Sequence, residues 1–256
     1  MAAKSNRTRR RRSDKRQLFE VEQIRSQDLT VSQDRQDRLA SQIIRLQPKT
    51  LNQARLIKSI RANHVTVASA PAGCGKTLVA LHEAAWMLEK GAIDQILYTK
   101  PIINFREQNG LGFLPGDLDE KVLPLLAPLL DNLEVFMKPG KIRYLLDKGK
   151  IKYQPMEHIR GRSLRHTFMI ADEFQGISVH GAITVISRIE ESSKLVMLGD
   201  SKQCDLLLPA NALDDALTRL KGAQSVGIVE FTSNDIVRNA FLKDVLMRYD
   251  PHPRNN

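Results

Sequence analysis

From about residue 64 onward, short runs of β-branched and apolar residues alternate with longer amphipathic stretches. The short runs predict strands at residues 64–68, 95–99, 168–171, 194–198 and 226–231. The amphipathic stretches predict helices at residues 78–90, 118–133, 179–189, 211–220 and 236–247. Strands that alternate with helices of about 10 to 15 residues are typical of βαβ units. The pattern therefore predicts an α/β fold, with a parallel sheet covered by helices on both faces.

The N-terminal part of the chain has a different texture, because it is polar and rich in charge. Residues 1–16 carry eight Lys and Arg against one Asp, a net charge of 8 − 1 = +7, while the whole chain has +10. Blocks of like charge are usually disordered and often contact polyanions. We expect a disordered basic arm at residues 1–16, a helical lead-in at 17–47, one folded domain at 48–250 and a short tail at 251–256.

Nothing in the sequence predicts secretion or a membrane span. The arginines of the arm are followed by polar and acidic residues instead of an apolar run, and no segment approaches the ~18 apolar residues that a spanning helix needs. The two cysteines, Cys74 and Cys204, do not suggest a disulfide framework. We therefore expect a cytoplasmic protein with no membrane partner.

The first chemical motif, Ser-Ala-Pro-Ala-Gly-Cys-Gly-Lys-Thr at residues 69–77, lies between the first predicted strand and its helix. Glycines at this position let successive N–H groups turn inward around a phosphate, and the helix N-terminus adds partial positive charge. Lys76 would reach the β and γ phosphates of ATP, and the Thr77 hydroxyl would ligate Mg²⁺. The other positions expected around the nucleotide are Ala70, Ala72, Gly73, Cys74 and Gly75.

Two further motifs follow later strands. Asp172 ends the third predicted strand, where it would hold Mg²⁺, and Glu173 comes next, where it would polarise an attacking water. After the fourth predicted strand, Gln203 offers an amide that would touch the γ-phosphate or the water and so report which nucleotide is bound.

A fourth candidate lies upstream of residues 69–77, which we call the phosphate loop. Thr50 is placed to cap a helix that begins near Leu51, which would put Gln53 in its first turn. A glutamine amide pairs well with the N6/N7 edge of adenine, so we expect Gln53 to read the base.

These residues, taken in order, resemble the PhoH family of P-loop ATPases over about residues 48–249. The segment Leu-Gly-Phe-Leu-Pro-Gly-Asp at 111–117 is the specific part of the match, because the nucleotide motifs recur in many helicase-like ATPases. The other matching segments are 48–53, 70–77, 120–121, 160–162, 172–175, 199–203 and 235–238. The resemblance implies a RecA-like ATPase core, similar to one motor domain of a superfamily-1 helicase, with activity on RNA or another nucleic acid.

The sequence departs from the family pattern at three places. Ala70 stands where the family has Gly, which is compatible with the loop only if its φ is negative. Cys74 stands where Thr is frequent, and Thr-Lys-Pro at 99–101 replaces the usual Arg-Pro pair. Some relatives carry a fused PIN nuclease domain. Residues 1–47 are too short for one, so we do not expect ribonuclease activity.

A helicase motor closes ATP between two RecA-like modules, and the second module donates an arginine to the γ-phosphate. Because this sequence has room for one module, we expect a homo-oligomeric ring, such as a hexamer, in which a neighbour supplies that arginine. The candidates are Arg160, Arg162 and Arg238.

We expect Mg²⁺-dependent ATP hydrolysis coupled to the binding or remodelling of single-stranded nucleic acid, with RNA favoured over DNA. The loop at 100–117, which offers cationic and aromatic side chains for phosphates and bases, supports this expectation, as does the arm. Two alternatives stay open. A small-molecule kinase would need an acceptor pocket, and a nucleotide-dependent assembly protein with slow hydrolysis would show no stimulation by RNA or DNA.

Overall fold

The computed structural model describes residues 43–101, 118–159, 161, 163–203, 211–237, 241 and 244–245. Its helices are α3 (Leu51–Ala62), α4 (Lys76–Glu89), α5 (Leu118–Glu134), α6 (Pro139–Asp147), α7 (Val179–Ile186) and α8 (Ala212–Arg219). Its strands are β1 (Val65–Ser69), β2 (Gln95–Thr99), β3 (Ile151–Tyr153), β4 (Thr167–Ala171), β5 (Lys194–Gly199) and β6 (Val226–Glu230). Single 3₁₀ turns lie at Met156–His158, Phe174–Gly176 and Ser233–Asp235.

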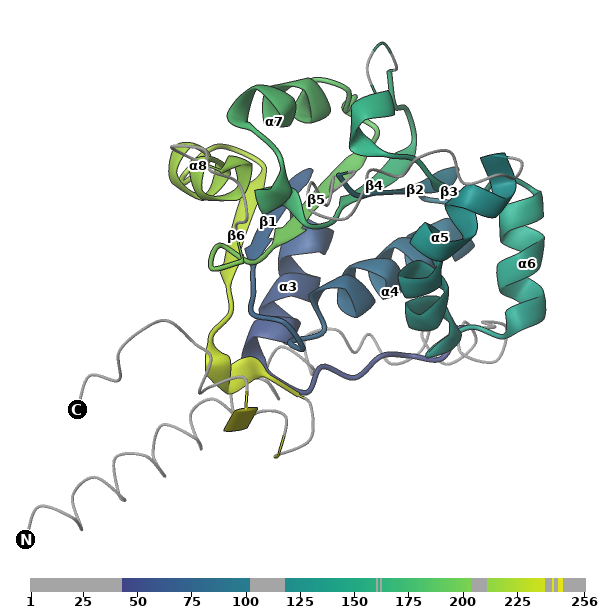
Figure 1. The fold of residues 1–256 in the computed structure, drawn as a ribbon, viewed down its shortest axis with the longest axis horizontal. Helices are drawn as coiled ribbons and strands as arrows, with labels where there is room; N and C mark the ends of the chain where they lie inside the picture. The colour runs from purple at the N-terminus through teal and green to yellow at the C-terminus, as the bar shows by residue number, and fades with distance from the viewer. Residues whose placement is uncertain are drawn as a thin grey trace, which may run out of the picture.

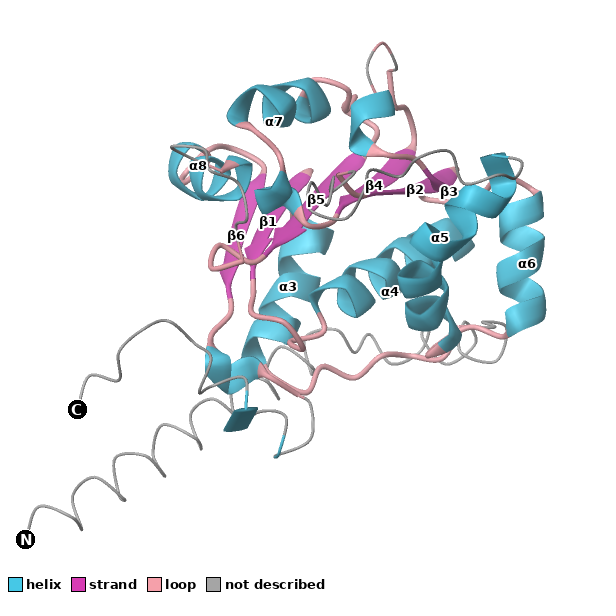
Figure 2. Ribbon diagram, viewed as in Figure 1, coloured by secondary structure: helices cyan, strands magenta, loops and turns pink. Residues whose placement is uncertain are grey.

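The six strands of the described chain form one parallel sheet in the order β3-β2-β4-β5-β1-β6. Helices α3, α4, α5 and α6 cover one face of the sheet, and α7 and α8 cover the other (Figures 1 and 2). The predicted α/β fold with helices on both faces is therefore confirmed. Strand β5 lies between β1, which leads into the glycine-rich loop, and β4, which ends before Asp172.

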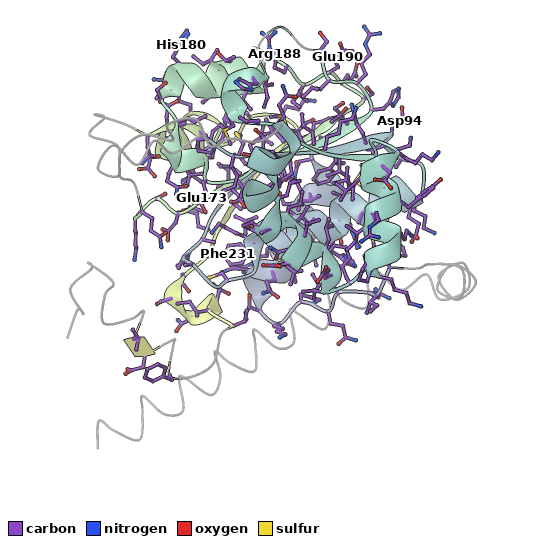
Figure 3. All side chains as sticks on the ribbon, turned by 45° about the vertical axis from the view of Figure 1, so that its right-hand side comes forward. Asp94, Glu173, His180, Arg188, Glu190 and Phe231 are labelled. Carbon is purple, nitrogen blue, oxygen red and sulfur yellow. The ribbon has the colours of Figure 1, made fainter. Side chains whose placement is uncertain are left out.

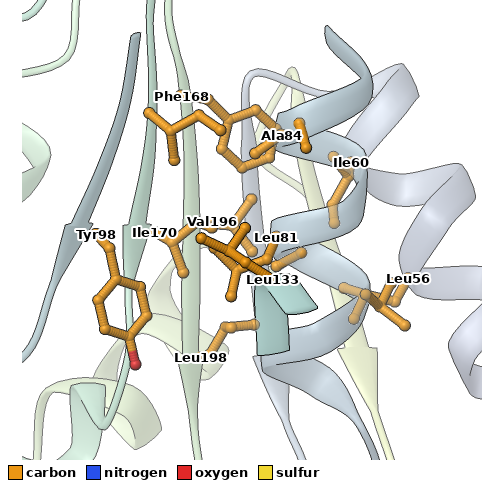
Figure 4. Packing of buried hydrophobic residues seen from close by; sticks show 14 of the residues in the cluster. Leu56, Ile60, Leu81, Ala84, Tyr98, Leu133, Phe168, Ile170, Val196 and Leu198 are labelled. Atoms are coloured by element: carbon orange, nitrogen blue, oxygen red, sulfur yellow. The ribbon is translucent and has the colours of Figure 1, made fainter. Parts of the chain in front are cut away.

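The sheet is apolar on both faces, so successive side chains of each strand enter different cores. In β4, Phe168 and Ile170 pack with α3, α4 and α5, while Met169 points to the opposite core with α7 and α8. Figure 4 shows the first of these cores, in which Leu81 and Ala84 of α4 lie against the central strands. This two-sided burial holds the strand ends, and the loops that follow them, in fixed positions.

The loops that carry the predicted chemistry leave the carboxyl ends of these parallel strands. Figure 3 shows Glu173, after β4, and Phe231, after β6, on one side of the molecule, whereas Asp94 and Glu190, which precede β2 and β5, lie toward the other. Ligands of open α/β sheets bind at the carboxyl edge of the strands.

Among the described residues, we find no helix with the length and apolar character that a membrane span requires.

The structure agrees with all five predicted strands within one residue at each end, and Thr50 caps α3 as expected, its hydroxyl accepting from Gln53 N at 3.2 Å. The pattern missed α6 and β3, because β3 has only three residues and α6 begins with Pro-Gly.

Two helix predictions need correction. The predicted lead-in was to reach residue 47, but residues 43–47 are not helical and Ile43 instead pairs with Met137 in an antiparallel bridge. The helix predicted at residues 236–247 does not begin at Ile236, which is extended, although residues 241, 244 and 245 within this range are helical. Residues 1–42, which contain the predicted basic arm, and residues 246–256 lie outside the described part of the chain.

The packing of α3 on β6 leaves no room for a side chain at Gly227. A Cβ there would lie 2.0 Å from Ser59 Oγ and 2.6 Å from Asn63 Nδ2. We expect Gly227→Ala to lower the free energy of unfolding by about 1–3 kcal/mol, as overpacking does in other cores. The control is Gly140→Ala, since a Cβ at Gly140 meets nothing within 4 Å. Urea denaturation of both variants measures the difference, and equal stabilities would contradict the packing described here.

Candidate nucleotide-binding site

The loop between β1 and α4 turns through two left-handed residues. Gly73 has φ 83° and Gly75 has φ 75°, a conformation that favours glycine. Ala70 is fully buried and is not among the residues with positive φ, and its N–H donates to Gly199 O at 2.9 Å. The condition on an alanine at position 70 is therefore met, and the loop is anchored to the end of β5.

Helix α4 begins in this loop without a side-chain cap. Gly75 is its N-cap residue and offers no acceptor to the N–H groups of the first turn. Three other helices use a side chain for this purpose, namely Thr50 in α3, Ser178 in α7 and Asn211 in α8. Uncapped N–H groups at a helix N-terminus suit an anion, and Lys76 adds a positive charge at the same place. The loop is therefore suited to holding phosphate.

Asp172 lies where β4 ends and faces the first turn of α4. Its side chain is nearly buried, with 4% of the residue exposed. Oδ2 accepts from Thr77 Oγ1 at 3.0 Å and from the Tyr98 hydroxyl at 2.7 Å, and Oδ1 accepts from Glu173 N at 3.0 Å. The structure thus brings together Asp172 and Thr77, which are 95 positions apart in sequence and were both predicted as metal ligands.

The donor set at this point fits Mg²⁺. A carboxylate and a hydroxyl are the hard oxygen ligands that Mg²⁺ takes, usually together with phosphate oxygens and water. Among the described residues, the two groups that donate to Oδ2 are neutral hydroxyls, and no basic side chain forms an ion pair with Asp172. Thr77 and Asp172 are the residues that would hold the metal.

Tyr98 is a residue of this site that the sequence analysis did not identify. It lies in β2, next to β4, and its ring is fully buried in the core (Figure 4), while its hydroxyl donates to Asp172. Burial raises the pKa of Tyr98 well above its usual range, and the nearby charge of Asp172 raises it further. The phenol therefore stays protonated and donates. In the sequence, the only indication of this role was that the side chain of Tyr98 has a polar end although it lies in an apolar strand.

Glu173 follows Asp172 in a left-handed conformation, with φ 54° and ψ 40°. A non-glycine residue with positive φ is sparsely populated, and such strain is concentrated at functional sites. The Glu173 side chain is 30% exposed, its Oε2 accepts from Gln175 Nε2 at 2.7 Å, and its Oε1 lies 3.9 Å from Lys100 Nζ. The carboxylate is accessible to water and is held from two sides.

Gln175 ties the loop after β4 to the loop after β5, a role that sequence analysis also missed. Its Oε1 accepts from Asp200 N at 3.2 Å, and its Nε2 donates to Glu173 and, at 3.4 Å, to Gln203 O. A Cβ at Gly199 would lie 2.4 Å from Gln175 Oε1, which explains the glycine at that position. Gln203 joins this network through its backbone carbonyl. Its side chain is exposed, and the contact of this side chain with the γ-phosphate stays a prediction.

Gln53 links α3 to the phosphate loop. It is 5% exposed, its Oε1 accepts from Lys49 N at 2.7 Å, and its Nε2 donates to Cys74 O at 2.9 Å. The nearly buried amide thus uses one acceptor and one donor position on backbone groups of Lys49 and Cys74. The adenine contact of Gln53 stays a prediction, and the contacts that it makes here position the loop backbone.

A segment after β6 closes the loop from another side. Phe231 N donates to Ser69 O at 2.8 Å, and Val237 N donates to Gly73 O at 3.2 Å. Asp235 accepts from Asn52 of α3 at 2.8 Å and caps its own turn through Thr232. The phosphate loop is therefore held by β5, α3 and the residues after β6 together.

Several predicted residues fall outside the described part of the chain. These are the arginine-finger candidates Arg160, Arg162 and Arg238, the cysteine Cys204, and residues 102–117 of the loop proposed to contact nucleic acid. Their roles stay predictions. Of the cofactor-binding positions within the loop, Cys74 is fully buried, while Ala72 is partly exposed.

A glycine-rich loop between a strand and an uncapped helix, with a carboxylate beside it at the end of a second strand, defines a P-loop nucleotide-binding fold. The chain belongs to the PhoH family, since the family model described as PhoH-like protein matches residues 45–250. The family resemblance seen in the sequence is confirmed.

Curated relatives agree with this assignment. A PhoH-like protein of Synechocystis is 36% identical over 203 residues, which cover 79% of this chain and 61% of the relative. A PhoH-like protein of Mycobacterium tuberculosis is 36% identical over 205 residues (80% and 58%), and Protein PhoH of Escherichia coli is 34% identical over 203 residues (77% and 57%). The chain thus spans about three-fifths of the length of these relatives.

Among solved structures, the large terminase of a thermophilic bacteriophage in complex with ADP is similar, with a TM-score of 0.45 and 13% identity. The similarity covers 77% of this chain and 49% of the terminase. It is too low to bear on function.

The contact between Tyr98 and Asp172 predicts a measurable role for the phenol. Tyr98→Phe keeps the ring and removes one donor from the carboxylate, so we expect about a 10-fold to 100-fold weaker affinity for Mg²⁺, as for other groups that orient metal ligands. Titration of Mg²⁺ against the binding of a fluorescent ATP analogue measures this. Tyr153→Phe, which removes the hydroxyl from the neighbouring ring, is the control. Unchanged Mg²⁺ affinity in Tyr98→Phe would contradict the role.

Proposed function

We propose that this protein hydrolyses ATP with Mg²⁺ and couples hydrolysis to the binding or remodelling of single-stranded nucleic acid, RNA in the first place. The observation that carries the proposal is the meeting of three elements at one sheet edge: the phosphate loop, Asp172 beside Thr77, and the accessible carboxylate of Glu173.

The residues divide the work of hydrolysis between them. The N–H groups of the loop and Lys76 bind the phosphates and place the γ-phosphate at the start of α4. Glu173, held by Gln175 and Lys100, orients a water and accepts its proton as the water attacks. Mg²⁺, when bound by Thr77 and Asp172, neutralises charge on the phosphate oxygens.

The coupling to nucleic acid rests on charge and on family. Residues 1–16 carry a net charge of +7, which suits a polyanion. The superfamily-1-like core that the PhoH resemblance implies acts on nucleic acid in helicases. The hydrogen bonds of Gln175 join Glu173, which would activate the water, to the loop after β5. A change of the bound nucleotide would therefore alter the conformation of both loops.

Hydrolysis needs charge stabilisation opposite Lys76, and we propose that a second copy of the chain provides it within a ring. An arginine supplied in this way is worth about 10³ to 10⁵ in rate. Arg160, Arg162 and Arg238 are the candidates. Sedimentation at protein concentrations used for turnover should show an assembly larger than one chain, and a monomer with full turnover would contradict the ring.

Two substitutions separate nucleotide binding from chemistry. Lys76→Ala removes the cation from the phosphate loop and should abolish both ATP binding and phosphate release. Glu173→Gln should bind ATP normally but release phosphate about 10² to 10⁴ times more slowly, because the amide cannot accept the proton. Lys90→Ala, at the other end of α4, is the control.

Phosphate release is measured with and without single-stranded RNA, and nucleotide binding is measured separately. If Lys76→Ala and Glu173→Gln turn ATP over like the parent protein, the assignment of the site is wrong. If RNA and DNA leave the turnover of the parent protein unchanged, hydrolysis is not coupled to nucleic acid.

A further inference from the structure

The surface formed by α6, β3 and the turn between them concentrates positive charge. Residues 138–152 contain six basic residues and one acidic residue, a net charge of 6 − 1 = +5. Since the chain carries +10 and residues 1–16 carry +7, the other 225 residues have a net charge of 10 − 7 − 5 = −2. We call this the α6–β3 surface, and its basic residues are Lys138, Lys141, Arg143, Lys148, Lys150 and Lys152.

Most of this charge faces solvent. All of the basic residues of the surface are exposed except Lys141, which is partly buried and pairs with Glu89. Within the described chain the others form no ion pair with an acidic side chain, although Asp147 lies among them on the outer side of α6. Exposed like charges on one short segment repel each other, which a bound polyanion would relieve.

An aromatic ring stands within the same surface. Tyr144 is 58% exposed, whereas Ile142, Leu145 and Leu146 of the same helix face the core. Lys148 Nζ lies 5.9 Å from the centre of the Tyr144 ring, so a cation and a flat apolar face are presented together. Proteins that bind single-stranded nucleic acid combine these two features, a basic surface for the backbone and rings on which bases stack.

The fold also gathers the lysines and leaves them accessible. Gly149 turns the chain with φ 62°, and Lys152 folds back over this turn, its Cε lying 3.2 Å from the position of a Cβ at Gly149. Within the described part of the chain, β3 is an edge strand that pairs with β2 alone, so α6 and β3 lie at the margin of the sheet, away from α7 and α8 (Figure 1).

We propose that the α6–β3 surface binds single-stranded RNA, with Lys148, Lys150 and Lys152 on the phosphates and Tyr144 stacked on a base. The choice of RNA as the ligand rests on the proposed function, while the surface itself rests on the charge, exposure and ring described above.

Strand β3 connects this surface with the strand that carries Tyr98, although Lys148 and Lys150 precede β3 and so lie toward the edge of the sheet opposite to Asp172, which follows β4. Tyr153 of β3 is in register with Tyr98 of β2, and their rings are 6.3 Å apart. Tyr98 donates to Asp172, and Gln154 N donates to Tyr98 O at 3.0 Å. An RNA that orders or shifts β3 therefore acts on the strand that carries the Asp172 donor.

The first test compares two double variants of the full chain that lose the same charge. Lys148→Ala with Lys150→Ala removes two cations from the proposed interface, and Lys58→Ala with Lys221→Ala removes two exposed cations elsewhere. Binding of a fluorescent oligouridylate is followed by anisotropy over a salt series. The salt slope is the slope of the logarithm of the binding constant against the logarithm of the salt concentration. We expect its magnitude to fall by about 1.4 in the first variant, since each phosphate contact of a single strand contributes about 0.7, and to stay unchanged in the second.

The second test concerns stacking. Tyr144→Ala should weaken binding of the same oligouridylate about tenfold, while Tyr144→Phe, which keeps the ring, should bind like the parent protein. Because all of these side chains are exposed, melting temperatures should match that of the parent and exclude misfolding as the cause.

Each outcome separates the interface from the proposed function. If the two double variants change the salt slope equally, or if Tyr144→Ala binds normally, the interface is wrong even where RNA still stimulates ATP turnover. If the interface variants behave as expected but RNA leaves turnover unchanged, the coupling fails and the interface stands. A protein that binds anionic phospholipid vesicles through Lys148 and Lys150, and no RNA, overturns the choice of ligand.

Discussion

A buried carboxylate is the constraint on which the rest of the site depends. Removing a charged group from water costs several kcal/mol unless hydrogen bonds replace the lost hydration. For Asp172 the replacements are Thr77 from α4, Tyr98 from β2 and the backbone of Glu173. These donors come from separate elements, so the carboxylate is satisfied only when α4, β2 and β4 are assembled in this order and register. The hydrogen bonding of Asp172 therefore depends on the topology of the sheet.

The same principle explains how loops from distant parts of the chain are held together at one edge of the sheet. The phosphate loop is bonded to the end of β5 through Ala70 and to the segment after β6 through Gly73. Gln175 joins the loops after β4 and β5, and fits only because position 199 is a glycine. Polar groups buried in this way form a network in which each member needs the others.

Local patterns were sufficient to place five of the six strands in the described chain, the glycine-rich loop and the acidic pair, because each of these is encoded by neighbouring residues. A short β-branched apolar run marks a buried strand, and glycines before Lys76 mark the turn that wraps phosphate. Tyr98 and Gln175 escaped because their roles exist only across strands: a tyrosine in an apolar run resembles any core residue until β2 is paired with β4. For Gln53, a contact with adenine was predicted and stays a prediction, while its contacts with backbone groups of Lys49 and Cys74 were not predicted, since they depend on how α3 packs.

The elements that the pattern missed also show why a surface can carry information that a core does not. A three-residue edge strand and a helix that begins with Pro-Gly contribute few positions to the interior, so core packing constrains them weakly. Hydrophobic periodicity indicates which positions are buried, so it predicts poorly those elements that bury few residues. The charge of +5 on residues 138–152, against −2 for the chain outside this segment and the arm, is not explained by packing. Where the core demands least, the residues that remain exposed are free to serve a ligand, and the chemistry of those beside β3 is that of a polyanion site.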